Sequence, residues 1–329
     1  MTSPDTKFEH SSVMEDEIAE VFACVPHGVV VDATLGGAGH SLKLLRMYKW
    51  MRVLGIDRDP LAIANCEKII ASHPEIGDRL VVCHGRFDQL PQIMEAMQLT
   101  EISGALFDLG VSSPQFDLPE RGFSYRQEGP LDMRMDTTAK LTAADVVNSY
   151  DTERLTRVIR EYSDERFAFR IARAIVAHRP ISTTTELAEI VSAAIPAPAR
   201  RTGGHPAKRT FQAIRIEVNN ELEMLPGALD DAIDATTAGG RIAVLTYHSG
   251  EDRIVKRVFN EAEVDPTVEN IATPFAHPRQ SSYKRVRRVR MRETPSEIEI
   301  ARNPRSKSAR LRVIEKSSVS MNPKITAGS

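Results

Sequence analysis

The feature that most constrains the fold is an alternation of short apolar runs and helical segments in the first third of the chain. The runs cover residues 29–31, 52–56, 79–83 and 102–109, and helical segments cover 41–48, 60–72 and 89–98. Runs of this kind are typical of strands buried on both faces of a parallel sheet. Strands joined by helices at this spacing form right-handed crossovers. The sequence therefore predicts an α/β fold with a Rossmann-like, doubly wound and mostly parallel sheet.

The alternation stops at residue 127 and resumes only at a fifth strand over 242–246. Between them the pattern predicts helices, with Thr142, Asp151 and Asp164 as N-caps. The expected helices cover 142–149, 151–162, 164–178, 183–195, 209–224 and 227–236. Basic and apolar residues alternate in 286–292 and 309–314, which predicts a closing pair of strands with the last one antiparallel. We expect a discontinuous sheet domain over 1–126 and 205–329, with an inserted all-helical domain over 127–204.

Charge is distributed unevenly along the chain. The formal net charge of the 329 residues is −2, yet residues 274–312 hold twelve lysines and arginines against three glutamates, a net charge of +9. A protein that coats nucleic acid without selectivity would be basic throughout. A local basic segment instead favours a phosphate-binding surface, although a solvated strand without a partner is the alternative.

Three cysteines, Cys24, Cys66 and Cys83, show no metal-ligand spacing and no pairing. No apolar run reaches the roughly 20 residues that a membrane span needs. The first 17 residues are polar and acidic, unlike a signal peptide. We expect a cytoplasmic protein without a metal or a membrane partner, and the sequence does not decide between a monomer and a homodimer.

A glycine loop follows the first predicted strand, in the sequence DATLGGAGHS over 32–41. Glycines at this position let the backbone approach a ligand closely. The dinucleotide fingerprint GxGxxG does not fit, because its third glycine would fall on Leu42. An acidic residue followed by a short glycine loop favours S-adenosylmethionine over a pyrophosphate. A glycine turn without a ligand is the alternative.

Two further residues stand where the second and third strands end. Asp57 can accept hydrogen bonds from both ribose hydroxyls of a nucleoside, and its alternative role is a helix N-cap. Phe87 can stack on adenine, and its alternative role is core packing. These residues indicate a nucleoside cofactor without identifying it.

The fourth strand ends at Asp108, and a polar residue next to proline, Ser113-Pro114, follows. Amino-methyltransferases place such a pair here, because acceptors for the N–H protons can orient an exocyclic amine and help to remove a proton. Methylation of a pyrimidine ring carbon needs a nucleophilic cysteine instead. Cys83 is expected within the third strand, and neither Cys24 nor Cys66 is expected at the carboxyl end of a strand, so the predicted target is a nitrogen.

The whole pattern resembles the MraW/RsmH family of small-subunit rRNA cytosine-N4 methyltransferases. The resemblance runs from near the N-terminus to about Glu315. Its most specific segment is RGFSYRQEGPLDMRMD over 121–136. Gly250 departs from the family pattern, which usually has leucine there. The other matching segments are His10 to Glu17, DATLGGAGHS, GIDRDPLAI, HGRF, DLGVSSPQFD, DERFAFRIARAIV, HPAKRTFQAIRIEVNNEL, YHSGEDRIVKRVF and NPRSKSARLR.

This resemblance implies methylation of the N4 amine of a cytidine in the decoding region (P site) of 16S rRNA, within the 30S subunit or a late assembly intermediate. Expected cofactor contacts are Ala38, Gly39, His40, Asp57, Phe87, Asp108 and Gln115. Asp108, Ser113 and His248 are the expected catalytic residues. Expected RNA contacts are His205, Lys208, Arg209, Arg285, Arg287 and Arg288.

Two alternatives stay open at this point. One is an assembly factor that binds S-adenosylmethionine without catalysis, although the intact glycine loop, Asp57 and Asp108 argue against decay of the site. The other is a DNA amino-methyltransferase, although the motif Ser113-Pro114-Gln115-Phe116 lacks the second proline usual in that class. A nicotinamide-dependent oxidoreductase is disfavoured by the failed GxGxxG.

Overall fold

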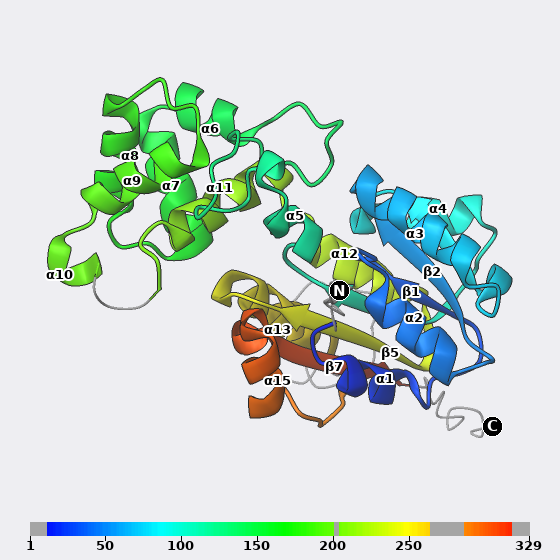
Figure 1. Ribbon diagram of the computed structural model, residues 1–329. Helices are drawn as coiled ribbons and strands as arrows, with labels where there is room; N and C mark the ends of the chain where they lie inside the picture. Colours follow the sequence, from blue (N-terminus) through cyan, green and yellow to red (C-terminus); the bar gives the residue numbers. More distant parts are fainter. Residues whose placement is uncertain (1–11, 201–203, 264–285, 318–329) are drawn as a thin grey trace, which may run out of the picture. The chain divides into compact units, whose positions relative to one another are not determined.

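The computed structural model describes residues 12–200, 204–263 and 286–317, which divide into two compact units (Figure 1). The sheet unit lies within Met1–Asp57, Leu61–Leu109 and Pro226–Ser329. The helical unit comprises Arg58–Pro60 and the described part of Gly110–Leu225. Within the described ranges, no helix has the length and apolar character that crossing a membrane requires.

The sheet unit is built on a sheet of seven strands in the order β3-β2-β1-β4-β5-β7-β6. Strands β1 to β5 are parallel, β7 is antiparallel to β5, and β6 is antiparallel to β7. This topology confirms the predicted mostly parallel sheet with an antiparallel last strand. The strands are β1 (Val29–Asp32), β2 (Arg52–Asp57), β3 (Leu80–His84), β4 (Ile102–Asp108), β5 (Thr236–Thr246), β6 (Val286–Arg288) and β7 (Arg310–Lys316).

Helices connect the parallel strands, as the alternation predicted. One face of the sheet packs against α1 and α2, which contribute Ile18, Phe22, Leu44 and Leu45 to a core shared with the strands. The helices of this unit are α1 (Glu15–Phe22), α2 (Gly39–Met47), α3 (Pro60–Ser72), α4 (Leu90–Ala96), α12 (Leu225–Ala235), α13 (Ser249–Glu263) and α15 (Glu297–Arg302). Pro60 and Leu225 are assigned to the helical unit.

Carboxylates stand at the ends of three neighbouring strands. Asp32, Asp57 and Asp108 end β1, β2 and β4, whose pairing is parallel and in register. Parallel strands present their carboxyl ends on the same side of a sheet, where ligands bind in open α/β folds. The fold therefore gathers residues that lie up to 76 positions apart in the sequence.

The helical unit has its own core, formed by apolar side chains of its helices and of the loop before them. Figure 1 shows α6, α7, α8 and α9 gathered into one bundle, with α10 at its end. The helices are α5 (Ser113–Asp117), α6 (Ala143–Ser149), α7 (Thr152–Ser163), α8 (Ala168–Ala177), α9 (Thr184–Ala194), α10 (Ala197–Arg200) and α11 (Lys208–Asn219).

Two of the three predicted N-caps are confirmed. The side chains of Thr142 and Asp151 accept hydrogen bonds from the backbone N–H groups of Asp145 and Arg154. The prediction for Asp164 is wrong, because this residue ends α7 in a left-handed conformation (φ 51°). Aspartate tolerates that conformation better than most residues, so it serves a helix end as well as a helix start.

The helical unit extends beyond the predicted insert of 127–204 at both ends. Phe123 joins its core on one side, and Phe211 and Ile214 of α11 join on the other. Strand β5 is also longer than predicted, since it begins at Thr236 directly after α12. The roles assigned to the two parts, cofactor binding and substrate recognition, stay predictions.

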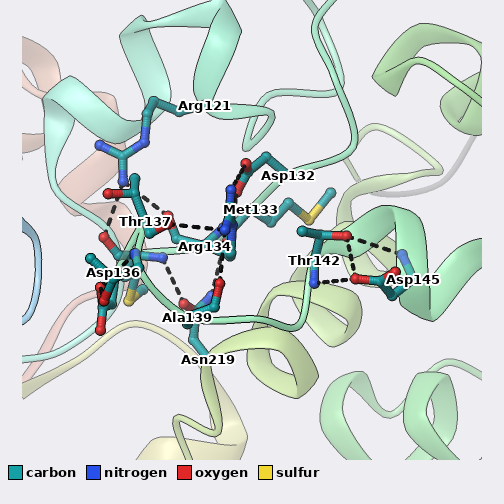
Figure 2. A network of polar contacts seen from close by, with 12 residues as sticks. Arg121, Asp132, Met133, Arg134, Asp136, Thr137, Ala139, Thr142, Asp145 and Asn219 are labelled. Carbon is teal, nitrogen blue, oxygen red and sulfur yellow. Dashed lines mark hydrogen bonds and ion pairs between the residues drawn. The ribbon is translucent and has the colours of Figure 1, made fainter.

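The most specific sequence segment, 121–136, forms a tightly bonded loop in the helical unit (Figure 2). Arg134 donates two hydrogen bonds to the Asp132 carboxylate, at 2.9 and 2.7 Å, and one each to the backbone carbonyls of Thr137 and Ala139. The Asn219 amide bonds the backbone on both sides of residue 134. The polar side chains of this loop thus hold its own backbone in place.

Candidate cofactor site and substrate-binding residues

The glycine loop joins β1 to α2 in a conformation that leaves room beside it. Ala38 adopts the left-handed region (φ 59°) and its N–H donates to the Leu35 carbonyl at 2.7 Å. A Cβ at Gly37 would have no neighbouring atom within 4 Å, whereas one at Gly39 would lie 2.1 Å from the Ser12 hydroxyl. The loop therefore exposes backbone at Gly37 while packing closely at Gly39.

Asp57 holds this loop at the end of β2. Its Oδ2 accepts the Gly36 N–H at 2.7 Å, and the Leu35 N–H donates to the Ile56 carbonyl at 3.0 Å. The carboxylate is half-buried. Because a carboxylate has about four acceptor positions, Asp57 can bond the loop and still accept from a diol.

Asp108 lies between two side chains that approach its two oxygens. The Tyr247 hydroxyl donates to Oδ1 at 2.7 Å, and Nε2 of His40 lies 3.5 Å from Oδ2. The Asp108 N–H donates to the Thr34 hydroxyl at 2.7 Å. Burial, together with Asp108, raises the pKa of Tyr247 well above its usual value, so its hydroxyl remains a donor.

His40 is buried in the first turn of α2 and has a free ring nitrogen. Among the described residues, Nδ1 of His40 has no hydrogen-bond partner. Burial alone would lower the pKa of His40, but Asp108 and then Asp32 raise it above its ordinary value. A buried histidine that favours its charged form, with one nitrogen unpaired, is suited to bind an acceptor on a ligand.

Asp32 is the most deeply buried carboxylate at the strand ends. It is 2 % exposed and accepts a hydrogen bond from the Ser41 hydroxyl at 2.6 Å. Burial raises the pKa of Asp32 to about 6, and Ser41 and His40 only partly oppose this shift. Neither Asp32 nor Tyr247 was among the predicted site residues. Asp32 was visible as the acidic residue before the glycine loop, and Tyr247 was visible only as the first residue of the matching segment YHSGEDRIVKRVF.

Phe87 follows β3 and is 7 % exposed. Its ring meets that of Phe107 edge to face, with the centroids 5.8 Å apart. This contact matches the alternative of core packing, and adenine stacking at Phe87 stays a prediction.

These features fit S-adenosylmethionine, which has a ribose diol, an adenine and a charged amino-acid end. The Asp57 carboxylate suits the diol, and the open backbone at Gly37 suits close approach of the ligand. The unpaired Nδ1 of His40 is a buried polar atom that a ligand can satisfy. The predicted contacts Ala38, Gly39, His40, Asp57, Phe87 and Asp108 thus come together at the carboxyl end of the sheet.

The remaining predicted cofactor contact, Gln115, belongs to the helical unit. Its side-chain amide donates to Asp59 at 2.9 Å and accepts the Ser112 N–H at 3.1 Å, and the side chain is 5 % exposed. Both ends of the amide are therefore used within the helical unit. Ser113, a predicted catalytic residue, is the first residue of α5 and is half-buried.

His248 follows β5, as predicted, and is engaged with Glu251. Its Nε2 lies 3.1 Å from Glu251 Oε1, and its Nδ1 accepts the Glu251 N–H at 3.4 Å. The other carboxylate oxygen of Glu251 accepts the Tyr247 and His248 N–H groups. Nδ1 accepts a backbone N–H, and Nε2 faces the Glu251 carboxylate but makes no hydrogen bond among the described residues. His248 must therefore turn away from Glu251 before it can relay a proton.

The cysteines are not placed for nucleophilic catalysis. Cys66 lies on α3 and its thiol contacts the Gly36 carbonyl at 3.5 Å. Burial raises the pKa of Cys66 to about 12 and also raises that of Cys83. A thiol with a raised pKa is a poor nucleophile, so Cys66 and Cys83 are unsuited to nucleophilic catalysis. In the described part of the chain, no group of histidine, cysteine and acidic side chains could hold a metal ion.

A cavity of about 370 Å³ lies elsewhere in the sheet unit. It is lined by the end of α12 and by residues of and after α4, among them Met94, Leu99 and Ala235. Leu99 precedes β4 and Ala235 precedes β5, which places the cavity at the opposite end of the strands from Asp108. It is therefore not part of the candidate site.

The predicted RNA contacts fall in both units. His205, Lys208 and Arg209 are exposed at the start of α11, and Arg209 lies 3.7 Å from Glu165. Arg287 and Arg288 are exposed on β6 and are paired with Glu315 and Glu263. Arg285 lies outside the described residues. The structure thus leaves these two β6 arginines less available for phosphate than the charge count suggested.

Other basic residues lie at the carboxyl end of the sheet. Arg310 begins β7 opposite Thr246, where β5 ends. The Leu311 N–H donates to the Glu293 carbonyl at 2.8 Å, so the segment after β6 reaches the same end of the sheet. Exposed arginines and lysines of this region are Arg290, Arg292, Arg302, Arg305, Lys307 and Arg310.

Comparison with known proteins identifies the family. The model of the MraW methylase family matches residues 7–317. The chain is 47 % identical over 313 residues to ribosomal RNA small subunit methyltransferase H of Thermobifida fusca (strain YX), covering 93 % of each chain. It is also 47 % identical over 322 residues to the protein of that name in Mycobacterium sp. (strain KMS), covering 95 % of this chain and 85 % of that one.

Among solved structures, a putative rRNA methylase from Clostridium thermocellum aligns with 93 % of this chain and 98 % of its own, at 16 % identity and a TM-score of 0.43. The match of the family model and the identity to the two relatives both extend over nearly the whole chain, and they confirm the resemblance found in the sequence. The chain therefore belongs to the MraW methylase family and is a methyltransferase that uses S-adenosylmethionine.

Proposed function

We propose that this methyltransferase acts on small-subunit ribosomal RNA, at the N4 amine of a cytidine in the decoding region of 16S rRNA. Two relatives at 47 % identity are named as ribosomal RNA small subunit methyltransferases, which supports the RNA substrate. The substrate is the RNA within the 30S subunit or a late assembly intermediate. The observation that carries the chemistry is Asp108, held at the end of β4 between Tyr247 and His40.

Binding and orientation dominate the proposed mechanism. S-adenosylmethionine, when bound, supplies a methyl group already activated by its positive sulfur. Asp57 binds the ribose, while the glycine loop and His40 bind the amino-acid end. Asp108 is held by hydrogen bonds to Thr34 and Tyr247 and lies 3.5 Å from His40, so it orients the site rather than moving a proton. Correct placement of two reactants can account for a large part of a rate enhancement.

The target amine must lose one N–H proton as its bond to the methyl carbon forms. Ser113, next to Pro114 at the start of α5, is the proposed acceptor of an N–H hydrogen bond. His248 is the proposed relay once its contact with Glu251 opens. A cytosine amine inside stacked RNA cannot line up with a methyl donor, so the base has to be turned out of its stack.

RNA binding is proposed to be largely electrostatic. The exposed basic residues near Arg290 and Arg310 lie at the same end of the sheet as Asp108. Lys208 and Arg209 add positive charge on the helical unit. Neutralisation of phosphates releases counterions, so affinity should fall steeply as salt rises.

Transfer of a labelled methyl group tests this proposal. The protein is incubated with labelled S-adenosylmethionine and, separately, with 30S particles lacking the modification, with naked 16S rRNA and with duplex DNA. The modified base is then mapped. We expect label on one cytidine N4 in 30S particles. Label on DNA instead, or binding of the cofactor without transfer to any substrate, would support the two alternatives that the sequence left open.

A further inference from the structure

We infer that Tyr125 and His205 of the helical unit form a stacking platform for an unpaired base of the RNA substrate. The inference rests on the proposed function, because that function makes RNA the partner. It goes further by naming a contact with a base on the helical unit, whereas the basic residues alone provide only contacts to phosphate. Unpaired bases bind proteins by stacking on aromatic rings, whatever their sequence.

The two rings are already stacked on each other. Their centroids lie 4.4 Å apart and their planes differ by 17°. Phe211 of α11 meets Tyr125 edge to face at 5.7 Å, so the tyrosine rests on the core of the helical unit. Tyr125 is half-buried, whereas His205 is exposed. The outermost ring of the stack is therefore anchored on the core through Tyr125 and accessible to a ligand.

His205 is held in one orientation by a hydrogen bond to the backbone. Its Nδ1 accepts the Ala207 N–H at 3.2 Å, which fixes the ring and leaves the proton of the neutral form on Nε2. Partial burial, and then the positive charge of Arg126, lower the pKa of His205. A preoriented ring loses little conformational entropy when it binds a base, and its Nε2–H can also donate a hydrogen bond to the base.

The surroundings of the stack are suited to the phosphates on either side of such a base. The Arg126 guanidinium lies 5.8 Å from the centre of the Tyr125 ring, and Lys208 follows His205 at the start of α11. Both cations are exposed. An aromatic surface flanked by cations matches single-stranded nucleic acid better than an apolar protein segment, which would leave these charges unpaired.

The alternative is that the stack only fixes the chain before α11. That role would leave His205 buried under neighbouring groups, like the other aromatic residues of the helical core. Phe123 and Phe211 are 4 % exposed, but His205 is exposed. A residue needed for packing alone also gains little from neighbouring cations such as Arg126 and Lys208.

A fluorescent base distinguishes the two roles. The probe is a single-stranded oligoribonucleotide of mixed sequence with 2-aminopurine at its centre, whose fluorescence falls when it stacks on an aromatic ring. We expect quenching by the unaltered protein and by His205→Phe, which keeps a ring. His205→Ala should lose the quenching and weaken binding roughly ten- to a hundredfold, the range for one stacked base.

Salt dependence separates stacking from charge. His205→Ala should leave the slope of log affinity against log salt unchanged, whereas Lys208→Ala should lower the slope by up to about one unit and keep the quenching. His178→Ala is the matched control, because His178 is also exposed on the helical unit but outside the stack. All variants should bind S-adenosylmethionine with equal affinity. This measurement serves as the control that the variants are folded.

Binding and quenching by His205→Ala equal to those of His178→Ala would overturn the inference. Failure of the proposed function is a different result, namely no methyl transfer to 30S particles by the unaltered protein. If that transfer is seen and His205→Ala binds normally, the RNA is held elsewhere and the stack is a packing feature.

Discussion

The strand ends of the sheet unit and the 121–136 loop of the helical unit are both rich in charged and polar residues, but the fold uses them differently. In the loop, Arg121 donates to the buried Asp59 carboxylate and to two backbone carbonyls. At the strand ends, His40 keeps an unpaired nitrogen and burial raises the pKa of Asp32 to about 6. The loop satisfies its own polar groups, whereas the strand ends leave groups for a ligand to satisfy.

This difference shows that most of a specific sequence motif can serve its own conformation, which leaves only some of its residues, such as Tyr125, for a ligand. The 121–136 segment is the most characteristic part of the sequence. Its conformation requires particular residues, since a Cβ at Gly122 would lie 2.1 Å from the Pro130 carbonyl oxygen and one at Gly129 would lie 1.9 Å from that of Pro119. A motif can therefore be restricted by the fold alone. The following predictions test the distinction, beginning with the largest effect.

Asp108→Ala should lower the rate of methyl transfer by on the order of 100-fold or more, since it removes the group that orients the strand-end site. The measurement is single-turnover transfer at saturating S-adenosylmethionine and RNA. Asp108→Asn is the matched control, because it keeps an acceptor for the Tyr247 hydroxyl. If Asp108→Ala and the double variant Ser113→Ala/His248→Ala both react at near-normal rates, the acceptor site lies on other loops.

Arg121→Ala should act on stability instead. The Arg121–Asp59 pair is 2.9 Å long, and the two side chains are 7 and 4 % exposed. Removal of one partner leaves a buried charge unpaired and costs about 3–5 kcal/mol of the free energy of unfolding. Denaturant titration measures this change. Arg134→Ala, which breaks the more exposed pair with Asp132, should cost less. If Arg121→Ala is as stable as the unaltered protein, the polar contacts of the loop do not stabilise the fold, and the proposed difference between loop and strand ends is wrong.

The sequence predicted those parts of the site that depend on a residue's position relative to a neighbouring strand. Asp32, Asp57 and Asp108 could be placed because each directly follows a recognisable strand. The contact of Gln115 with Asp59 could not be predicted, because the two residues lie 56 positions apart and the pairing appears only in the fold. Tyr247 was missed for the same reason, since its hydroxyl bonds a carboxylate 139 positions earlier. His248 was placed correctly after β5, but its contact with Glu251 depends on how α13 begins.

Asp57→Ala should weaken binding of S-adenosylmethionine by roughly 1.5–3 kcal/mol, the range for hydrogen bonds to a charged group. Part of this loss reflects the freed Gly36 N–H, which donates to Asp57 at 2.7 Å. Asp57→Asn keeps an acceptor and should lose less. Calorimetry gives the affinities, and an unchanged value in a folded Asp57→Ala variant would contradict the assignment of the ribose site.

Tyr247→Phe should reduce methyl transfer by about tenfold, because one hydrogen bond to Asp108 is lost while its contact with His40 remains. The effect should appear in kcat more than in the affinity for RNA, since Tyr247 acts through Asp108. Combining Tyr247→Phe with Asp108→Ala should add little to the single Asp108→Ala loss. Additive losses would mean that the two residues act independently.

The smallest effect on RNA binding is expected for two arginines of the basic segment 274–312, which has the largest charge imbalance in the sequence. Arg287 and Arg288 are already paired with Glu315 and Glu263, so binding a phosphate requires exchanging one partner for another. The variant Arg287→Gln/Arg288→Gln should therefore flatten the salt dependence of RNA binding by less than one unit per residue. Arg290→Gln/Arg310→Gln, at the carboxyl end of the sheet, should flatten it more. Binding at a series of salt concentrations measures both slopes, and the reverse ranking would place the RNA on the β6 strand rather than at the strand ends.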